Sequence, residues 1–220
     1  MIGKFFTFKG IFTTILLITL GFSQVSLEIA NVDTSAGTLD IYMTNSAGCS
    51  FCADSVYNNN SIEWTDKKDV CETLADTNWV AYNSSLDSVA CTAIPSLDGN
   101  GGWWFSGKVG GFQFELPGVT VTNATAPTGF TTSISASTVL GFSLTGATIP
   151  VGSDVLLTQV TFTTFLGSSI CFGEDTGSAG STVISGSEVN DSGNIVDLYV
   201  GANWGGCYCV ADEDIDGVCD

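Results

Sequence analysis

The amino-acid sequence predicts an all-β protein, a β-sandwich interrupted by a disulfide-stapled insertion. Between residues 109 and 165, apolar and polar residues alternate with a period of two, which is typical of strands that pack on one face only. Phe112 and Phe114 share one face of the first run, whereas Gln113 and Glu115 share the other. Gly, Pro, Ser and Asn separate the runs and supply the backbone angles of turns. No window in this region has the i, i+3, i+4 apolar spacing of an amphipathic helix.

The same alternation predicts strands on both sides of this region. Two strands precede the insertion, and two follow a loop rich in Gly and Ser at 173–181. Apolar residues of the central strands should form the sandwich core. The predicted strands span 25–32, 39–45, 109–117, 119–123, 139–146, 155–165, 182–185 and 195–201, and the predicted core residues are Phe112, Phe114, Leu140, Phe142, Leu144, Leu156, Val160 and Phe162.

Residues 46–108 interrupt this pattern. The segment is polar and irregular, and it contains four cysteines and four of the five tryptophans. A structureless loop of this length is implausible inside a compact domain, so we expect an insertion stapled by two disulfides, with a short helix near 67–74. The sandwich domain should then span residues 25–207.

Residues 1–24 have the pattern of a secretory signal peptide. Lys4 and Lys9 form a basic start, the apolar run 11–22 follows, and Gly21 and Ser23 are the small residues that precede a cleavage site. An uncleaved membrane anchor is the alternative, but the run is shorter than the roughly 20 apolar residues that a span requires. We therefore expect a protein that is secreted or displayed at the cell surface, with no membrane segment after removal of the signal.

The eight cysteines are predicted to form disulfides, because an even number of cysteines in a secreted chain favours them over metal or redox chemistry. A zinc site in the first half is less favourable, since only one of its two cysteine pairs is closely spaced. The first four cysteines allow three pairings, and the sequence does not choose among them. In the second half we expect Cys171 to pair with Cys207. The eight are Cys49, Cys52, Cys71, Cys91, Cys171, Cys207, Cys209 and Cys219.

The net charge of the chain excludes several classes of partner, and its lack of histidine excludes most catalytic sites. The chain carries five lysines, no arginine and no histidine against 23 acids, a formal net charge of −18. Such a surface repels nucleic acids and anionic membranes and favours cations such as calcium. Without histidine the usual serine and cysteine triads are absent, and no pair of carboxylates stands out as a glycosidase pair. We expect no enzymatic activity.

The strand runs 39–45, 109–116, 139–152 and 156–162, in this order, resemble the cohesin-like domains of secreted, multidomain bacterial proteins. The resemblance covers residues 25–207 without the insertion. It implies a jelly-roll β-sandwich of about nine strands whose role is protein–protein docking, typically to dockerin modules. The insertion at 46–108 departs from this family pattern.

The acidic tail, residues 208–220, contains a candidate calcium site. Its D-x-D-x-D-G pattern supplies alternate carboxylates and a glycine that permits the tight turn around calcium. The run resembles the opening of a thrombospondin type 3 repeat, which implies calcium binding in a longer protein. An isolated solvated acidic tail is the alternative. The candidate ligands are Asp212, Asp214, Asp216 and Asp220.

The tryptophans are candidate ligand contacts, because exposed indoles stack on sugar rings. Neighbouring residues of a strand point to opposite faces, so Trp103 and Trp104 do not both face inward. Packing of the insertion against the sheet is the competing interpretation. The candidate contacts are Trp64, Trp79, Trp103 and Trp104.

Three functions remain open from the sequence. The first is a non-enzymatic interaction or adhesion module that docks an extracellular protein partner. The second is a structural subunit that self-assembles into a filament, surface layer or virion coat. The third is a carbohydrate-binding module that uses the tryptophans to bind a glycan.

Overall fold

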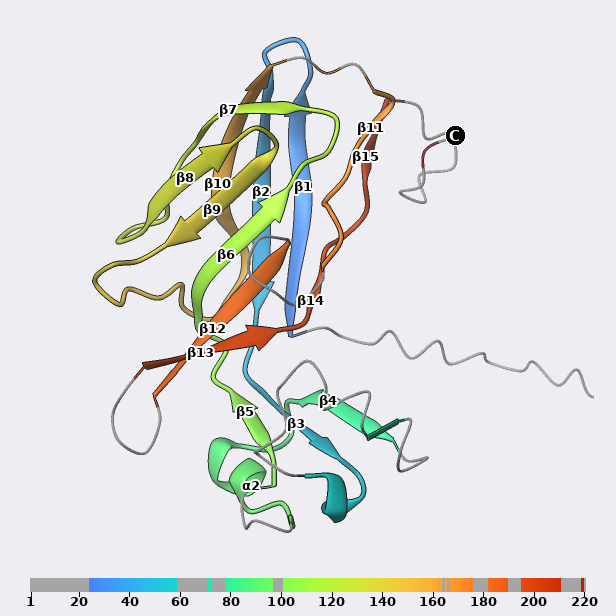
Figure 1. The fold of residues 1–220 in the computed structure, drawn as a ribbon, viewed down its shortest axis with the longest axis vertical. Helices are drawn as coiled ribbons and strands as arrows, with labels where there is room; N and C mark the ends of the chain where they lie inside the picture. The colour runs from blue at the N-terminus through green and yellow to red at the C-terminus, as the bar shows by residue number, and fades with distance from the viewer. Residues whose placement is uncertain are drawn as a thin grey trace, which may run out of the picture.

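The computed structural model is an all-β structure in which two large sheets face each other, as the sequence predicts (Figure 1). It describes residues 24–58, 71–72, 78–96, 101–163, 165, 167–175, 182–189, 195–210 and 219. We call the sheet β14–β1–β2–β10–β7 the first sheet and the sheet β13–β12–β6–β9–β8 the second sheet. Neighbouring strands in both sheets are antiparallel, except that β14 lies parallel to β1.

The predicted strands of the sandwich are all present. The structure adds β8, which the sequence analysis missed, and β14. The first sheet consists of β14 (Ala202–Asn203), β1 (Val25–Asp33), β2 (Thr38–Asn45), β10 (Gly152–Thr163) and β7 (Thr120–Ala124). The second consists of β13 (Ile195–Val200), β12 (Val183–Val189), β6 (Val109–Glu115), β9 (Thr138–Phe142) and β8 (Thr131–Ser135). A separate pair joins β11 (Ser169–Ile170) to β15 (Tyr208–Cys209).

The core lies between the inner faces of the two sheets. Buried Leu39 and Ile41 of β2 face it from the first sheet, and Phe112 and Phe114 of β6 face it from the second. The two phenylalanine rings stack at 6.0 Å. Phe112 also lies over Gly141 of β9, where an added Cβ would be 2.1 Å from the ring. Glycine is therefore required at this position to let the ring pack.

Four of the predicted core residues are wrong. Leu140 and Phe142 are half-buried on the outer face of β9, because Val139 and Gly141 take the inner positions. Leu144 follows the strand in a turn and is 86% exposed. Leu156 is 47% exposed, because a bulge between residues 156 and 158 shifts the alternation of β10 and brings Leu157 inward. The other four predicted residues, Phe112, Phe114, Val160 and Phe162, are buried as expected.

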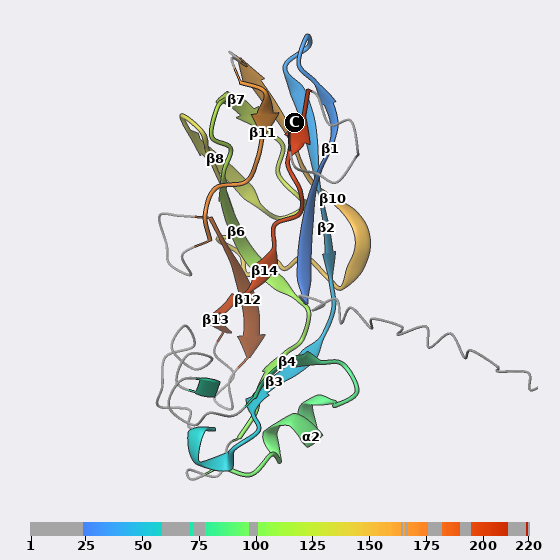
Figure 2. The same ribbon diagram turned by 90° about the vertical axis from the view of Figure 1, so that its right-hand side faces the viewer.

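The insertion forms a head that extends from one end of the sandwich (Figures 1 and 2). Its described residues are 48–58, 71–72, 78–96 and 101–105. They contain a three-stranded sheet of β4 (Trp79–Asn83), β3 (Gly48–Cys52) and β5 (Trp103–Phe105), with a helical turn η1 (Ser55–Tyr57) and a short helix α2 (Ser88–Thr92). None of these strands, nor α2, is predicted from the sequence. The helix expected near 67–74 lies outside the described residues except at positions 71 and 72.

All eight cysteines form disulfides. The head contains the pairs Cys49–Cys91 and Cys52–Cys71, which resolves the three pairings left open by the sequence. The predicted pair Cys171–Cys207 is confirmed, and it lies beside the β11–β15 pair. The fourth disulfide joins Cys209 to Cys219.

Candidate functional site

A groove of about 440 Å³ crosses the outer face of the second sheet, over the central strand β6. The glycines at positions 110 and 111 lie in it on β6. The cross-strand register places Phe142 of β9 on one side of Gly111 and Ser185 of β12 on the other. One step along the strands, Leu140 and Val183 flank Gln113 in the same way. Two half-buried apolar side chains of β9 therefore border the groove on one side, and Val183, Ser185 and Ser187 of β12 border it on the other.

Gly111 lies at a bulge, because Val109 and Gly111 pair with the adjacent residues Gly186 and Ser185 of β12, but the packing around it leaves room for a side chain. Its φ is not in the left-handed region, and an added Cβ would be 3.4 Å from its nearest neighbour, the carbonyl oxygen of Gly141. That distance is ordinary van der Waals contact. By contrast, a Cβ at Gly186 would be 3.0 Å from the buried ring of Phe105. Glycine within a strand weakens it and often marks either a bulge, which is present here, or a place where another chain or a ligand approaches closely.

The groove is uncharged, although the protein is strongly acidic. The described residues that line it include no acid and no base, whereas the whole chain carries 23 acids. The outer face of the first sheet is different. There Asp40 accepts hydrogen bonds from Asn31 at 2.9 Å and from Gln159 at 3.0 Å, and Glu28 and Asp154 line a smaller hollow. The uncharged groove on the second sheet therefore contrasts with the acidic groups on the outer face of the first.

Lys108 is the only basic residue that the structure describes. It is exposed and lies directly before β6, between the sandwich and the head. Its carbonyl oxygen accepts a hydrogen bond of 3.1 Å from the backbone N–H of Ser187, which lines the groove. The single described cation thus lies at the end of the groove nearest the head.

Most of the described tryptophan side chains in the head pack against other residues and are not exposed to solvent. Trp103 is 9% exposed and lies against Trp79, with ring centroids 5.5 Å apart. Phe105 is 4% exposed, so alternate residues of β5 face the interior, in agreement with the packing interpretation. Trp104 is half-buried on the opposite face. Trp64 lies outside the described residues, and the three candidate contacts that the structure describes do not form one shared platform, because Trp79 packs on Trp103 and Trp104 lies on the opposite face.

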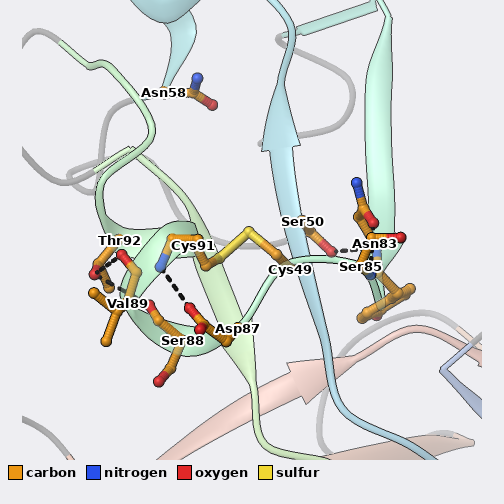
Figure 3. The surroundings of a disulfide bond; sticks show 12 residues. Cys49, Ser50, Asn58, Asn83, Ser85, Asp87, Ser88, Val89, Cys91 and Thr92 are labelled. Atoms are coloured by element: carbon orange, nitrogen blue, oxygen red, sulfur yellow. Dashed lines mark hydrogen bonds between the residues drawn. A yellow bond between two sulfur atoms is a disulfide. The ribbon is translucent and has the colours of Figure 1, made fainter.

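The opposite face of the head sheet is covered by α2. Figure 3 shows the disulfide that joins Cys49 of β3 to Cys91 of this helix. The helix begins at Asp87, whose carboxylate accepts a hydrogen bond of 2.8 Å from the N–H of Ala90. Such capping supplies one of the acceptors that the first turn of a helix lacks. The head is therefore held by covalent and local bonds in spite of its irregular sequence.

A polar cluster lies where the chain passes from the second sheet to the first. Asp175 accepts hydrogen bonds from the Tyr199 hydroxyl at 3.1 Å and from the Trp204 indole N–H at 2.7 Å. Burial raises the pKa of Tyr199, and the Asp175 carboxylate raises it further. Burial also raises the pKa of Tyr82, to about 12. Both phenols are therefore neutral at ordinary pH and serve as hydrogen-bonding groups.

The four candidate calcium ligands, Asp212, Asp214, Asp216 and Asp220, lie outside the described residues. Three of them fall between the two cysteines of the Cys209–Cys219 disulfide in the sequence. Within the described part of the chain, no group of three or more acidic, Cys or His residues is placed to hold a metal ion. Calcium binding by the tail therefore stays a prediction.

The groove is not predicted from the sequence. The available signal was the pair of glycines at 110–111 in a strand that otherwise alternates clearly.

Among the described residues, no helix is long and apolar enough to cross a membrane. Four disulfides indicate an oxidising compartment. Comparison of the chain with protein-family models, with curated proteins and with solved structures finds no match.

Proposed function

We propose that the protein is a secreted, non-enzymatic docking module that holds a protein partner against the outer face of its second sheet. The observation that carries the proposal is the uncharged groove over Gly111 on a chain of net charge −18. Charged residues are depleted at the centre of protein interfaces, because their desolvation is costly when they remain unpaired. The uncharged groove is therefore the part of this surface on which a partner can pack with the smallest free-energy cost of desolvation.

The cohesin-like resemblance supports the same role. The two facing sheets contain ten strands, close in number to the sandwich of about nine strands that the resemblance implies. The head and the β11–β15 pair are then additions to this scaffold. A docking module on an extracellular multidomain protein requires secretion, which the signal-like residues 1–24 and the four disulfides support.

The test is affinity capture from the medium of the cells that secrete the protein, with matched variants. Gly111→Trp fills the groove, whereas Leu156→Trp places the same indole on the exposed outer face of the first sheet. We expect a secreted protein that is retained by the wild type and by Leu156→Trp and lost with Gly111→Trp. Equal retention by all three proteins would contradict docking at this face.

A structural subunit of an extracellular assembly is the alternative that the same uncharged face permits. In that case the partner is a second copy of the chain. Size-exclusion chromatography with light scattering separates the two proposals, with and without millimolar calcium. Oligomers of the wild type that are absent in Gly111→Trp would favour assembly. A monomer both with and without calcium would favour a separate partner.

The carbohydrate-binding alternative has less support, because Trp103 is buried and Trp79 packs against it. Among the described tryptophans of the head, Trp104 is half-buried and has no stacking partner, although α2 covers part of its face. A glycan array that gives binding in the wild type and none in Trp104→Ala would favour this function over protein docking.

We also propose that the tail binds calcium through Asp212, Asp214 and Asp216. The Cys209–Cys219 disulfide closes the segment that contains these carboxylates, and closure reduces the entropy lost when they converge on an ion. Titration calorimetry with calcium should give binding in the wild type and none in a variant with all three residues changed to Asn. Unchanged binding in that variant would place calcium elsewhere.

A further inference from the structure

We infer that the partner segment carries an apolar side chain that stands on Gly111 and a carboxylate that pairs with Lys108. This inference rests on the proposed docking function and names the chemistry of the partner. It combines three observations: a bulge glycine, Gly111, at which an added Cβ would find room, an uncharged groove around it, and the single described cation at the end of that groove.

The apolar contact follows from the geometry around Gly111. The absence of a side chain there leaves a gap on the central strand between Phe142 on β9 and Ser185 on β12. Phe142 and Leu140 are half-buried, so each presents part of its apolar surface to this gap. A bulky apolar side chain of the partner would cover both and would remove their exposed surface from water. Hydroxyl groups of Ser185 and Ser187 are available to the polar backbone of the same segment.

The carboxylate of the partner segment is inferred from the charge distribution on this protein. Acidic groups of a partner are repelled by the net charge of −18 nearly everywhere on this protein. Lys108 is the exception among the described residues, and its side chain is exposed. A partner that places one acid over Lys108 and none elsewhere matches this distribution. The same charge pattern would also fix the direction in which the segment lies along β6.

The spacing between the two contacts is set by the strand. Lys108 and Gly111 are three residues apart, at most roughly 10 Å at the rise of a β-strand, and the bulge between Val109 and Gly111 shifts the alternation of faces between them. An extended partner segment would therefore place its acid about two to four residues from its apolar side chain, given the reach of the lysine. The sequences of peptides selected for binding give this spacing directly.

The experiment is a selection from a random-peptide library displayed on phage, with the purified, disulfide-bonded protein as the target. Enriched peptides are synthesised, and their affinities are measured for the wild type and four variants. Gly111→Trp fills the gap, and Gly111→Ala fills it partly with a Cβ that has ordinary contacts. Lys108→Met removes the charge and keeps the length of the side chain. Leu156→Trp is the control on the other sheet.

We expect enriched peptides with one acid two to four residues from a large apolar side chain. Gly111→Trp should weaken their binding by at least about 30-fold, as loss of a central contact does, and Gly111→Ala should weaken it less. Lys108→Met should weaken it by about 2- to 5-fold at low salt, and raised salt should remove this difference. Leu156→Trp should bind as the wild type does. Circular dichroism of each variant verifies its fold.

Peptides that bind the wild type and both Gly111 variants equally would overturn the inference. So would groove-dependent peptides that lack an acid and are insensitive to Lys108→Met. A library that enriches nothing, with a secreted partner still captured through Gly111, would also overturn the inference while the docking function stands. Capture that is independent of Gly111 would instead contradict the docking function itself.

Discussion

The hydroxyl oxygen of Tyr82 accepts a hydrogen bond of 2.8 Å from the backbone N–H of Gly201, 119 residues further along the chain. Tyr82 belongs to β4 of the head, and Gly201 joins β13 of the second sheet to β14 of the first. Tyr82 has a φ of +48°, which is uncommon for a bulky residue, and its ring packs edge-on against Phe105 at 6.4 Å. The head therefore contacts the sandwich at the residue where the chain passes from the second sheet to the first.

Tyr82→Phe should lower the free energy of unfolding by about 1–2 kcal/mol, because it removes this hydrogen bond from a half-buried backbone N–H. The ring and its contact with Phe105 are retained. Tyr42→Phe, on the outer face of the first sheet, is the matched control and should change stability by less than about 0.5 kcal/mol. Urea denaturation of the three proteins checks the prediction. Equal stability of Tyr82→Phe and the wild type would contradict a role for this bond at the junction.

Alkaline pH should destabilise the protein through Tyr82 and Tyr199. Burial raises the pKa of both phenols above the ordinary value of 10.0, to about 12 for Tyr82. Above pH 10 the unfolded chain releases these protons while the folded protein retains them, so stability falls as pH rises. Tyr82 steepens the fall by up to about 1.4 kcal/mol per pH unit in this range, and half-buried Tyr199 adds less, because solvent screens its interactions. Below pH 10 neither contributes to the pH dependence.

Urea denaturation at about pH 9 and about pH 11.5 measures this effect. The wild type should lose stability between the two values, and the double variant Tyr82→Phe, Tyr199→Phe should lose clearly less. An equal loss in the double variant would assign the effect to other groups.

Asn45 holds together the two ends of the head and a loop of the sandwich. Its side chain is 1% exposed, and its Nδ2 donates hydrogen bonds to the carbonyl oxygens of Gly107 and Pro150. Its Oδ1 has no partner among the described residues. Asn45→Asp should destabilise the protein by at least about 3 kcal/mol, because it places a buried carboxylate against two carbonyl oxygens. Asn123→Asp, on the exposed side of β7, should be nearly neutral by the same denaturation measurement.

The four disulfides should open in a defined order under native conditions. Cys49, Cys52, Cys71 and Cys91 in the head are each at most 1% exposed, whereas the four later cysteines are half-buried. Attack by a thiolate requires access to a sulfur atom. Cys171–Cys207 and Cys209–Cys219 should therefore be reduced first. Alkylation followed by peptide mapping at increasing reductant checks this order, and earlier opening of either head disulfide would contradict it.

The strands of the sandwich could be predicted because a period of two is a local property. Their faces could be predicted only where one face is clearly apolar, as at Phe112 and Phe114. In β9 both faces are apolar or small, so the sequence alone does not distinguish Val139 from Leu140. In β10 a bulge reverses the alternation at Leu157, and a bulge depends on the pairing with β2. Cys171–Cys207 was predictable because its partners flank neighbouring late strands.

The groove could not be predicted because it depends on which strands become neighbours. Gly111, Phe142 and Ser185 are far apart in the sequence and meet only through the order β12–β6–β9. The strands of the head were missed for a related reason. Cys49 and Trp103 belong to segments without an alternating pattern, and disulfides and α2 hold these segments in place.

Amide chemical-shift mapping locates the surface on which the partner docks. The ¹⁵N-labelled protein is titrated with the captured partner, and the perturbed amides are located in the structure. The docking account predicts that the largest changes gather on β6, β9 and β12, at Gly111, Phe142 and Ser185. Changes that gather instead on the outer face of the first sheet, or on the head around Trp104, would contradict it.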